Sequence, residues 1–364
     1  MKIQHVLDYL EKLFPLHLQE DYDNSGLQLG DPNATLHGCL VALDCTERVV
    51  DEAIAKKCNL ILTHHPLLFK GIKRIGMANS TERIITQCLK NDMVLYAIHT
   101  NLDNHGMGVN KKICDILGLH STKPLVPNAS NLFKLIVFSP KDAVEPLHEA
   151  LCDAGAGKLG NYYGCSFQSE GKGMFTPNEK ANPTLGAAHS AEVVEEIKME
   201  YIVPKQHLNH VLTAMHATHP YEEVAYDVMA LINKDYSLGS GMVGELKEAV
   251  DAQEFLLEVK MKFNCKAIRY TPTLGKNIRR VAVCGGSGSF LLGEALRQKA
   301  DVYISSDFKY HEFFGAEGKI IIADIGHYES EQFTQDLLCG IIKEKFPTFA
   351  VQITEHNTNP INFL

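Results

Sequence analysis

Two adjacent histidines, His64 and His65, directly follow a short apolar run. Imidazole nitrogens are common metal ligands, and a histidine pair at the end of a buried strand favours metal binding more than a single histidine does. Asp103 and His327 also follow apolar runs, and Glu331 lies one helical turn beyond His327. Imidazole and carboxylate groups delivered in this way predict a site for two divalent metal ions.

A metal pair of this kind supports hydrolysis. Two ions about 3.5–4 Å apart activate water and stabilise the negative charge that develops in the reaction. Zinc, manganese, iron and cobalt all suit imidazole with carboxylate ligands. Positions four apart on a helix share a face, so His327 and Glu331 could bind together and Glu331 could bridge the two ions. The alternative is that the histidines are surface or hydrogen-bonded residues without a metal.

The element that must position the histidine pair is the run over residues 60–63. It is rich in β-branched and apolar residues and too short for a helix, so it predicts a buried parallel strand that Pro66 ends. Ligands of open α/β sheets bind at this carboxyl edge. Because neighbouring strand residues point to opposite faces, both imidazoles reach one site only if the chain bends near Pro66.

The rest of the chain surrounds this strand with two kinds of pattern. Strands alternate with helices at both ends, which predicts βαβ units and a parallel sheet. The middle reads as strand–helix–strand twice, which predicts a ferredoxin-like α+β domain. We therefore expect an α/β protein of two similar βαβ half-domains, residues 1–128 and 238–364, that form a three-layer α/β/α fold, with an insertion at residues 129–237.

Several local expectations follow from periodicity and turn residues. Residues 328–345 predict one unbroken helix, and residues 285–289 predict a tight turn before a helix over residues 290–298. Ser80 is expected to cap a helix, as is Thr46, because hydroxyl oxygens accept from the first free backbone N–H groups. The glycine- and Asx-rich residues 21–30 predict a loop.

The two ends of the chain also resemble each other. Residues 53–65 match residues 295–307 in helix end, turn and strand, and residues 98–103 can be set against residues 326–331. Each half thus delivers a histidine and, four residues later, a carboxylate after an apolar strand. Internal duplication and shared fold constraints both explain this similarity, and both place polar residues of two half-sheets around one cleft.

Composition excludes some classes of protein. A net charge of −9 over 364 residues argues against non-specific nucleic-acid binding, and no apolar run reaches the roughly 18 residues of a membrane span. The N-terminal residues open an amphipathic helix rather than a signal peptide. The ten cysteines are scattered without a Cys-x-x-Cys pair, which predicts buried thiols of a reducing compartment. We expect a cytoplasmic protein.

A set of short motifs spans almost the whole chain. They are residues 23–28 (Asp-Asn-Ser-Gly-Leu-Gln), Asp44, His64-His65-Pro66, residues 99–103 (His-Thr-Asn-Leu-Asp), Ser306-Asp307-x-x-Tyr310-His311 and Asp324-x-Gly326-His327-x-x-x-Glu331. Together they resemble the family labelled "GTP cyclohydrolase 1 type 2 homologue", also called the Ngg-interacting-factor-three-like family. The middle segment is similar to the insertion of some bacterial members, with a PII-like or copper-tolerance-protein-like fold.

The resemblance implies more than the spacing does. It implies that the ligands of a dinuclear site are His64, His65, Asp103, His327 and Glu331, and all five are present. It also implies a toroidal homohexamer built from dimers, with the metal sites facing an internal cavity.

Further polar residues have two interpretations each. His99 and His311 match family positions near the metals, where they would transfer protons or orient ligands; the alternative is hydrogen-bonded packing. Asp307 ends a strand and could orient a ligand. Residues 285–289 could cradle a phosphate on backbone N–H groups, although tight-turn packing is favoured because no full Gly-x-Gly-x-x-Gly spacing is present. Residues 219–223 either bind a small ligand or form a corner into a strand.

Three basic residues follow the histidine pair, and they either hold phosphate or form a solvated loop: Lys70, Lys73 and Arg74. The first functional hypothesis is a metal-dependent hydrolase acting on a nucleotide, a phosphoester-like small molecule or a purine-like ring, and the family's label adds opening of the GTP ring. The second is a non-catalytic metal-binding or metal-handling scaffold with a ligand-sensing insertion. A ring that encircles nucleic acid is a third idea, and the acidic balance counts against it.

Overall fold

The structure is a computed structural model that describes residues 1–129, 131–273 and 275–364. The chain divides into two compact units. Residues Met1–Pro127 and Tyr236–Leu364 form the first, which we call the α/β unit, and Asn128–Asp235 form the second, which we call the inserted unit.

The α/β unit contains two sheets. The first has the strand order β1-β4-β3-β2-β15 and the second β11-β14-β13-β12-β10-β5. In the first sheet, β15, β2, β3 and β4 are parallel, and β1 is antiparallel to β4. In the second, β12, β13 and β14 are parallel, and β10 and β11 are antiparallel to their neighbours. Each sheet thus has a parallel centre, and the first sheet has an antiparallel strand at one border only, because its other border strand, β15, is parallel to β2.

The strands of the α/β unit are short apart from β12 and the two strands that lead to and from the insertion, β5 and β10. The bounds are β1 (Gly26–Leu29), β2 (Gly38–Ala42), β3 (Leu60–Thr63), β4 (Val94–Ala97), β5 (His120–Ala129), β10 (Lys234–Asp251), β11 (Arg269–Tyr270), β12 (Asn277–Ser287), β13 (Val302–Ser306), β14 (Ile321–Asp324) and β15 (Ala350–Ile353). The histidine pair follows β3, as the sequence predicts. The two sheets share the order β1-β4-β3-β2 and β11-β14-β13-β12, so the half-domains are similar in topology.

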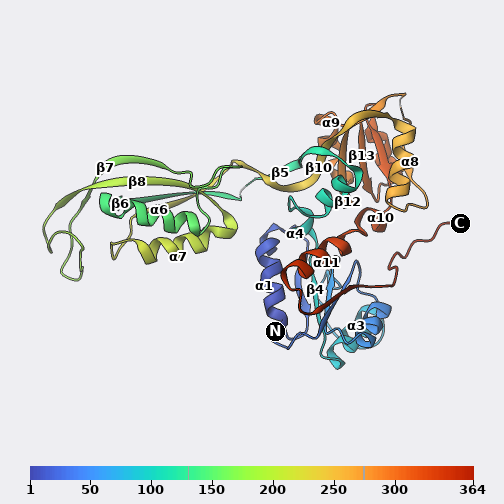
Figure 1. The fold of residues 1–364 in the computed structure, drawn as a ribbon, viewed down its shortest axis with the longest axis horizontal. Helices are drawn as coiled ribbons and strands as arrows, with labels where there is room; N and C mark the ends of the chain where they lie inside the picture. Colours follow the sequence, from blue (N-terminus) through green and yellow to red (C-terminus); the bar gives the residue numbers. More distant parts are fainter. Residues whose placement is uncertain (130, 274) are drawn as a thin grey trace. The chain divides into compact units, whose positions relative to one another are not determined.

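Helices cover the first sheet on both faces (Figure 1). The helices of the whole α/β unit are α1 (Ile3–Leu13), α2 (Glu47–Ala55), α3 (Ser80–Lys90), α4 (Thr100–Asp103), α5 (Val109–Leu117), α8 (Ala252–Lys262), α9 (Leu292–Arg297), α10 (His327–Glu331) and α11 (Thr334–Lys345), with short 3-10 turns η1 (Leu16–Leu18), η4 (Ser289–Leu291) and η5 (Tyr310–Ala316). α1 and α11 pack on one face, where apolar side chains recur at helical spacing, and α2 and α3 pack on the other. The expected α/β architecture is confirmed.

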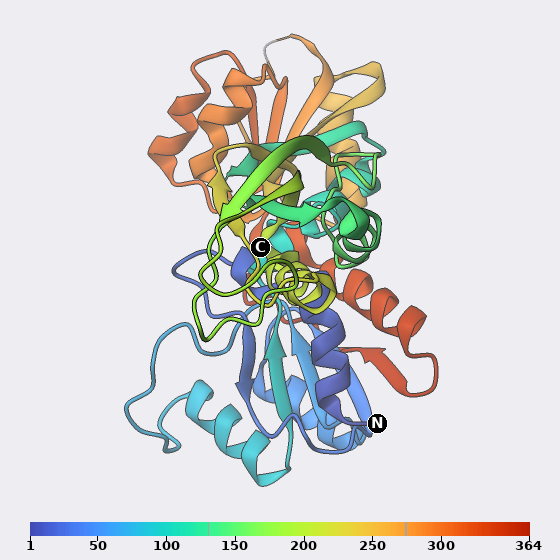
Figure 2. The same cartoon turned by 90° about the vertical axis from the view of Figure 1, so that its left-hand side faces the viewer.

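One hydrophobic core joins the two sheets of this unit. It contains Leu62 and Tyr96 from the first sheet and Val283 and Ile304 from the second, all at most 1% exposed. Figure 2 shows the blue strands of the first sheet and the orange strands of the second. This cluster also includes residues of helices α5 and α11, and the strands β3, β4 and β14 all contribute to it.

The inserted unit is a four-stranded antiparallel sheet with two helices. Its elements are β6 (Leu132–Pro140), η2 (Lys141–Ala143), α6 (Val144–Asp153), β7 (Phe167–Phe175), β8 (Glu192–Pro204), η3 (Lys205–His207), α7 (Leu208–Thr218) and β9 (Tyr226–Leu231). The strand order is β7-β8-β6-β9, and α6 and α7 pack on one face of the sheet (Figure 1). This βαββαβ arrangement is the ferredoxin-like topology that the sequence predicts.

Four local predictions are wrong. The helix expected over residues 328–345 is two helices, α10 and α11, because the Gln332 side chain donates to the Phe263 carbonyl and the Phe333 ring packs edge-on against Phe263. Gly285 and Gly286 belong to β12, so the turn begins later and is followed by η4 and α9.

The other two differences lie in the N-terminal half. Residues 26–29 form β1 rather than loop, since their backbone pairs with β4. The cap of α3 is Asn79, whose side chain accepts from the Glu82 N–H, and not Ser80. Thr46 caps α2 as expected and accepts from Val49 N–H at 3.3 Å.

Two general expectations can be compared with the structure. Eight of the ten cysteines are buried and free, and Cys152 and Cys165 are free and partly exposed. Within the described residues, no helix combines the length and the apolar character that crossing a bilayer demands.

Candidate metal centre

The histidine pair sits where β3 gives way to a bend. Its backbone N–H groups still donate to the neighbouring strand, His64 to Ala42 O at 3.3 Å and His65 to Leu43 O at 3.0 Å. The Thr63 hydroxyl then donates to the carbonyl of His65 at 2.8 Å. This bend brings the two imidazoles to one site, with ring centroids 4.9 Å apart, as Pro66 suggested.

His64 is fully buried and has a defined tautomer. Its Nδ1 lies 2.8 Å from the carbonyl oxygen of Ile98. A carbonyl only accepts, so Nδ1 carries the proton and Nε2 holds a free lone pair. Burial lowers the pKa of His64, although the charge of Glu331 opposes this. The side chain is therefore a neutral imidazole that offers Nε2 as a ligand atom.

His65 and His327 are each oriented by a carboxylate. Asp44 Oδ1 accepts from His65 Nδ1 at 2.7 Å, and Asp307 Oδ2 accepts from His327 Nδ1 at 2.6 Å. The two Nε2 atoms then face each other, 3.3 Å apart. A carboxylate on the outer nitrogen fixes the ring and makes the inner nitrogen a better ligand. The expected orienting role of Asp307 agrees with this contact.

Without a metal, these imidazoles bind protons strongly. Burial alone would lower the pKa of His65, but the hydrogen bond that it donates to Asp44 and the nearby carboxylate of Glu331 raise it to about 10. Burial likewise opposes the charge of Glu331 and Asp307 on His327, whose pKa is raised to about 11. The neighbouring carboxylates thus stabilise positive charge at the Nε2 atoms of His65 and His327, and either protons or metal ions can supply that charge.

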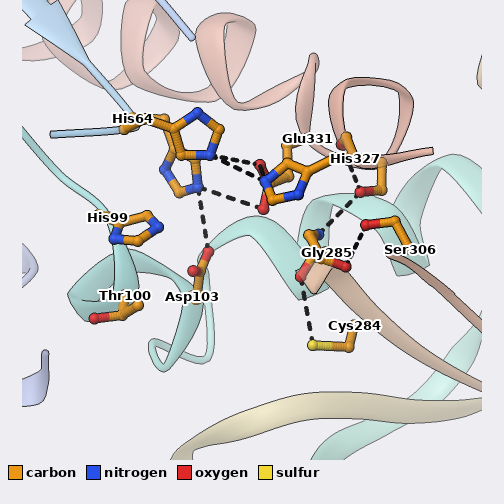
Figure 3. A network of polar contacts seen from close by, with 12 residues as sticks. His64, His99, Thr100, Asp103, Cys284, Gly285, Ser306, His327 and Glu331 are labelled. Carbon is orange, nitrogen blue, oxygen red and sulfur yellow. Dashed lines mark hydrogen bonds and ion pairs between the residues drawn. The ribbon is translucent and has the colours of Figure 1, made fainter. Parts of the chain in front are cut away.

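The carboxylate of Glu331 divides its two oxygens between the histidines (Figure 3). Oε1 lies 3.7 Å from His64 Nε2, whereas Oε2 lies 3.0 Å from His65 Nε2 and 3.1 Å from His327 Nε2. Asp103 Oδ1, at the end of α4, lies 3.6 Å from His64 Nε2. Burial and the charge of Glu331 raise the pKa of Asp103 well above its ordinary value.

These atoms fit a metal because they converge without bonding to one another. His64 Nε2, Asp103 Oδ1 and Glu331 Oε2 are buried and have no hydrogen-bond partner among the described residues, although buried polar atoms are nearly always paired. Two ligand atoms that are each about 2.0–2.2 Å from one ion lie roughly 3–3.5 Å apart, which is close to the separations observed. The residues present therefore fit divalent metal binding.

The glycines at the end of β12, Gly285 and Gly286, support this cluster through their backbone N–H groups. Gly285 N–H donates to Asn110 Oδ1 at 3.0 Å and Gly286 N–H donates to Ser330 Oγ at 2.9 Å. Gly286 has a left-handed φ of +62°, and a Cβ there would stand 2.3 Å from Glu331 Oε1. The backbone N–H groups are thus used internally, and the missing side chain makes room for Glu331. The packing interpretation thus agrees with the structure at these two glycines, although both belong to β12 and not to a turn.

Gly286→Ala is expected to lower metal affinity at least tenfold, because the new methyl group displaces Glu331 and the residue must hold a positive φ. Titration of the metal-free protein with zinc measures the change. Gly293→Ala is the matched control, since nothing lies within 4 Å of its Cβ position. Equal affinity in the two variants would contradict the support that Gly286 gives to Glu331.

His99 lies beside the cluster and is held by a carboxylate that the sequence reasoning did not assign. Ligand atoms of His64, His65 and His99 all lie within 4.8 Å of one another. His99 Nδ1 donates to Asp23 Oδ1 at 2.7 Å. Burial opposes the charge of Asp23, but hydrogen bonds from His99 and Thr100 lower the pKa of this carboxyl below its ordinary value. The side chain of Asp23 is fully buried, so it holds His99 with Nε2 free.

The remaining sequence candidates lie elsewhere. His311 is exposed on η5, where its ring contacts Tyr310 and Phe314, so it does not join the groups around Glu331. The basic residues of the loop after Pro66 are exposed: Lys70, Lys73 and Arg74. In the inserted unit, Tyr221, Glu222 and Glu223 line a separate cavity of about 660 Å³.

The ligand cluster opens into a cavity of about 670 Å³. Its walls include side chains of four carboxylates and several aromatic rings, and the C-terminal residues 359–361 border it. Thr358, next to this border, donates to Asp44 Oδ2 at 2.6 Å. A small molecule therefore has room above the ligand atoms.

The fold and this geometry define an α/β protein with converging histidine and carboxylate groups that could hold metal ions. The chain belongs to the Duf34/NIF3 (NGG1p interacting factor 3) family, whose model matches residues 1–360. A GTP cyclohydrolase 1 type 2 homolog of Halalkalibacterium halodurans is 39% identical over 99% of this chain and 98% of its own length. The homolog of that name from Bacillus subtilis is 36% identical with the same coverage.

A solved structure agrees with this assignment. The crystal structure of a Bacillus cereus protein related to NIF3 matches with a TM-score of 0.89 and 37% identity, and the match covers 100% of this chain and 99% of that one. The family that the motifs predict is confirmed. The PII-like character of the insertion stays a prediction.

Proposed function

We propose that this chain is a hydrolase that binds two divalent metal ions, zinc, manganese, iron or cobalt, and acts on a nucleotide or a phosphoester-like small molecule. The observation that carries the proposal is the division of the Glu331 carboxylate. Oε1 faces His64, next to Asp103, and Oε2 faces His65 and His327. Each oxygen thus completes a group of three ligand atoms, which is the arrangement of a carboxylate that bridges two ions.

The chain supplies binding, orientation and proton transfer around such a site. Metal ions bound there would activate water and stabilise negative charge on the substrate. In hydrolysis, the water oxygen bonds to the phosphorus or ring carbon, the bond to the leaving group breaks, and one water proton must leave. His99 is placed to accept that proton at Nε2 and pass it to the leaving group, since Asp23 occupies Nδ1 and stabilises the resulting imidazolium.

The test of the hydrolase is a comparison of wild type with His64→Ala. The zinc- or manganese-loaded proteins are screened for hydrolysis of nucleotides and phosphoesters, and circular dichroism checks the fold. The wild type is expected to turn over at least one substrate class, and the variant is expected to lose about a hundredfold or more in rate, because it lacks one of the ligand atoms that hold the metal ions. Unchanged turnover in His64→Ala would contradict the proposal.

A second candidate function is supported by the cavity of the inserted unit. Tyr221 and Glu222 line it, together with Lys172 and Lys198, so the unit offers a place for a small ligand. In this alternative the protein is a non-catalytic metal-binding or metal-handling scaffold that senses a ligand. Metal occupancy would then change assembly or partner binding while no substrate turns over.

The family resemblance also supports a proposed assembly. We expect a homohexamer built from dimers in the cytoplasm, which light scattering would show as six times the 40.4 kDa chain mass. A monomer in the metal-loaded state would contradict that assembly.

A further inference from the structure

The cavity above the ligand cluster has a charge balance that limits its substrate. Four carboxylates line it: Glu20, Asp44, Asp103 and Glu331. Among the described residues that line this cavity there is no lysine or arginine. Two divalent ions would neutralise the four carboxylates and leave no positive charge over. A triphosphate would therefore bring several negative charges that no lining side chain balances, although proteins bind phosphates with arginine, lysine or excess metal charge.

The basic residues of the loop after Pro66 do not line the cavity at the ligand cluster, so they do not balance these negative charges there. Lys70 lines a neighbouring depression that shares Tyr22 and Phe69 with this cavity, but it does not line the cavity at the ligand cluster. Lys73 and Arg74 are exposed, and neither is among the residues that line the cavity at the ligand cluster.

The same cavity has an aromatic rim. Tyr22, Phe69 and Phe290 come from three separate segments, and they are 69%, 49% and 71% exposed. Large aromatic side chains seldom stay so open in a group unless a ligand or partner covers them. Planar rings stack on such faces, because offset stacking buries apolar area and suits the ring quadrupole.

Phe69 connects this rim with the ligand cluster. Its ring meets His99 edge-on, with centroids 5.7 Å apart and planes at 85°. The His99 ring in turn contacts His64 and His65, with centroids 5.3 and 5.4 Å away. Phe69 thus lies beside the ligand cluster, so a ring stacked on it would lie close to the ligand atoms.

We propose that the substrate of this cavity is a planar heteroaromatic ring with at most one phosphate group, a nucleobase or nucleoside rather than a nucleoside triphosphate. The ring stacks on Phe69 and its polar edge faces the ligand cluster. The inference rests on the proposed function for the reaction of the bound ring, but binding of the ring needs only the aromatic rim. The absence of lysine and arginine from the described lining residues distinguishes this cavity from one suited to GTP.

A fluorescent pair of probes tests both parts. 2-Aminopurine riboside and its 5′-triphosphate share one ring and differ in charge, and stacking quenches their fluorescence. The chain has no tryptophan, so the probes can be excited without protein background. With the zinc-loaded full chain, the riboside is expected to bind at least tenfold more tightly than the triphosphate. Equal or tighter binding of the triphosphate would overturn the charge argument.

Variants of the rim test the stacking. Phe69→Leu keeps an apolar side chain and removes the aromatic face, so it is expected to weaken riboside binding about tenfold. Tyr310→Leu is the matched control, because Tyr310 is 72% exposed and does not line the cavity. Unchanged binding in Phe69→Leu, or an equal loss in Tyr310→Leu, would overturn the stacking role of Phe69.

Elemental analysis of the same samples separates this inference from the proposed function. If the chain retains zinc but does not quench the fluorescence of the riboside, the inference is overturned and the proposed metal centre is not affected. A chain that holds no zinc but still quenches the riboside through Phe69 would uphold the inference and overturn the proposed hydrolase.

Discussion

Glu331→Gln is expected to reduce the bound metal from about two ions per chain to at most one, and to weaken the remaining ion at least about a hundredfold. Both oxygens of Glu331 face imidazole nitrogens, and the carboxylate is almost fully buried. The amide that replaces it keeps the size but loses the charge, and its NH₂ group cannot bind a cation. Elemental analysis of protein purified without chelator measures the effect.

Glu52→Gln provides the matched control for this variant. Glu52 is also a buried glutamate of the α/β unit, but its oxygens accept from Lys56 Nζ at 2.6 Å and from Glu355 N–H at 3.0 Å. Its replacement is expected to lower the free energy of unfolding and to leave the metal content unchanged. If Glu331→Gln still bound two ions per chain, Glu331 would not be a shared ligand of both ions, and the proposed dinuclear site would be contradicted.

The ligand cluster was predictable from sequence because its strongest signals are local. His64 and His65 are neighbours in sequence at the end of an apolar run, and His327 and Glu331 are four apart. Only short-range geometry is needed to place each pair on one side of an element. Asp103 carries a weaker signal, since it becomes a candidate only through the strand that precedes it.

Asp307 was expected to orient a ligand, but Asp23 and Asp44, which also hold imidazole rings, could not be found in the same way. Asp23 lies 76 positions from His99, and Asp44 lies 21 positions from His65. Each sits in a loop whose composition favours turns, and nothing in the sequence tells which turn closes on the site. The motif around Asp23 was noted only through the family resemblance, which did not give it a role.

The wrong predictions of secondary structure share a physical cause. Helix periodicity continues through Gln332 and Phe333, yet the chain bends there because both side chains bind Phe263 at the end of α8. Likewise, Gly285 and Gly286 have turn composition but belong to β12, where a Cβ on Gly285 would stand 2.7 Å from Val109 Cγ1 and one on Gly286 would stand 2.3 Å from Glu331 Oε1. In both places long-range contacts override local preference, and both places adjoin the ligand cluster.

Asp103→Asn is expected to stabilise the metal-free protein and to weaken its response to metal. In the absence of metal, the buried carboxylate of Glu331 repels that of Asp103, and burial adds to this, so the pKa of Asp103 is raised. An acid whose pKa is higher in the folded state loses stability as pH rises above its unfolded pKa of about 4. Asparagine cannot ionise, so at pH 7 in EDTA we expect the variant to be about 1–3 kcal/mol more stable.

The stability advantage of Asp103→Asn over the wild type should shrink when metal is added. Zinc at a hundred times its dissociation constant stabilises the wild type by about 2.7 kcal/mol, and the variant, lacking one ligand oxygen, gains less. Thermal unfolding with EDTA and with zinc measures both states, and lowering the pH in EDTA should shrink the difference as Asp103 becomes protonated. Asp301→Asn is the control, because Asp301 accepts from the Arg279 and Arg280 N–H groups at 2.9 and 2.8 Å and its loss destabilises under both conditions. If Asp103→Asn, like Asp301→Asn, were less stable than the wild type in EDTA, the Asp103 carboxylate would stabilise the fold itself. That outcome would contradict its role as a ligand for a cation.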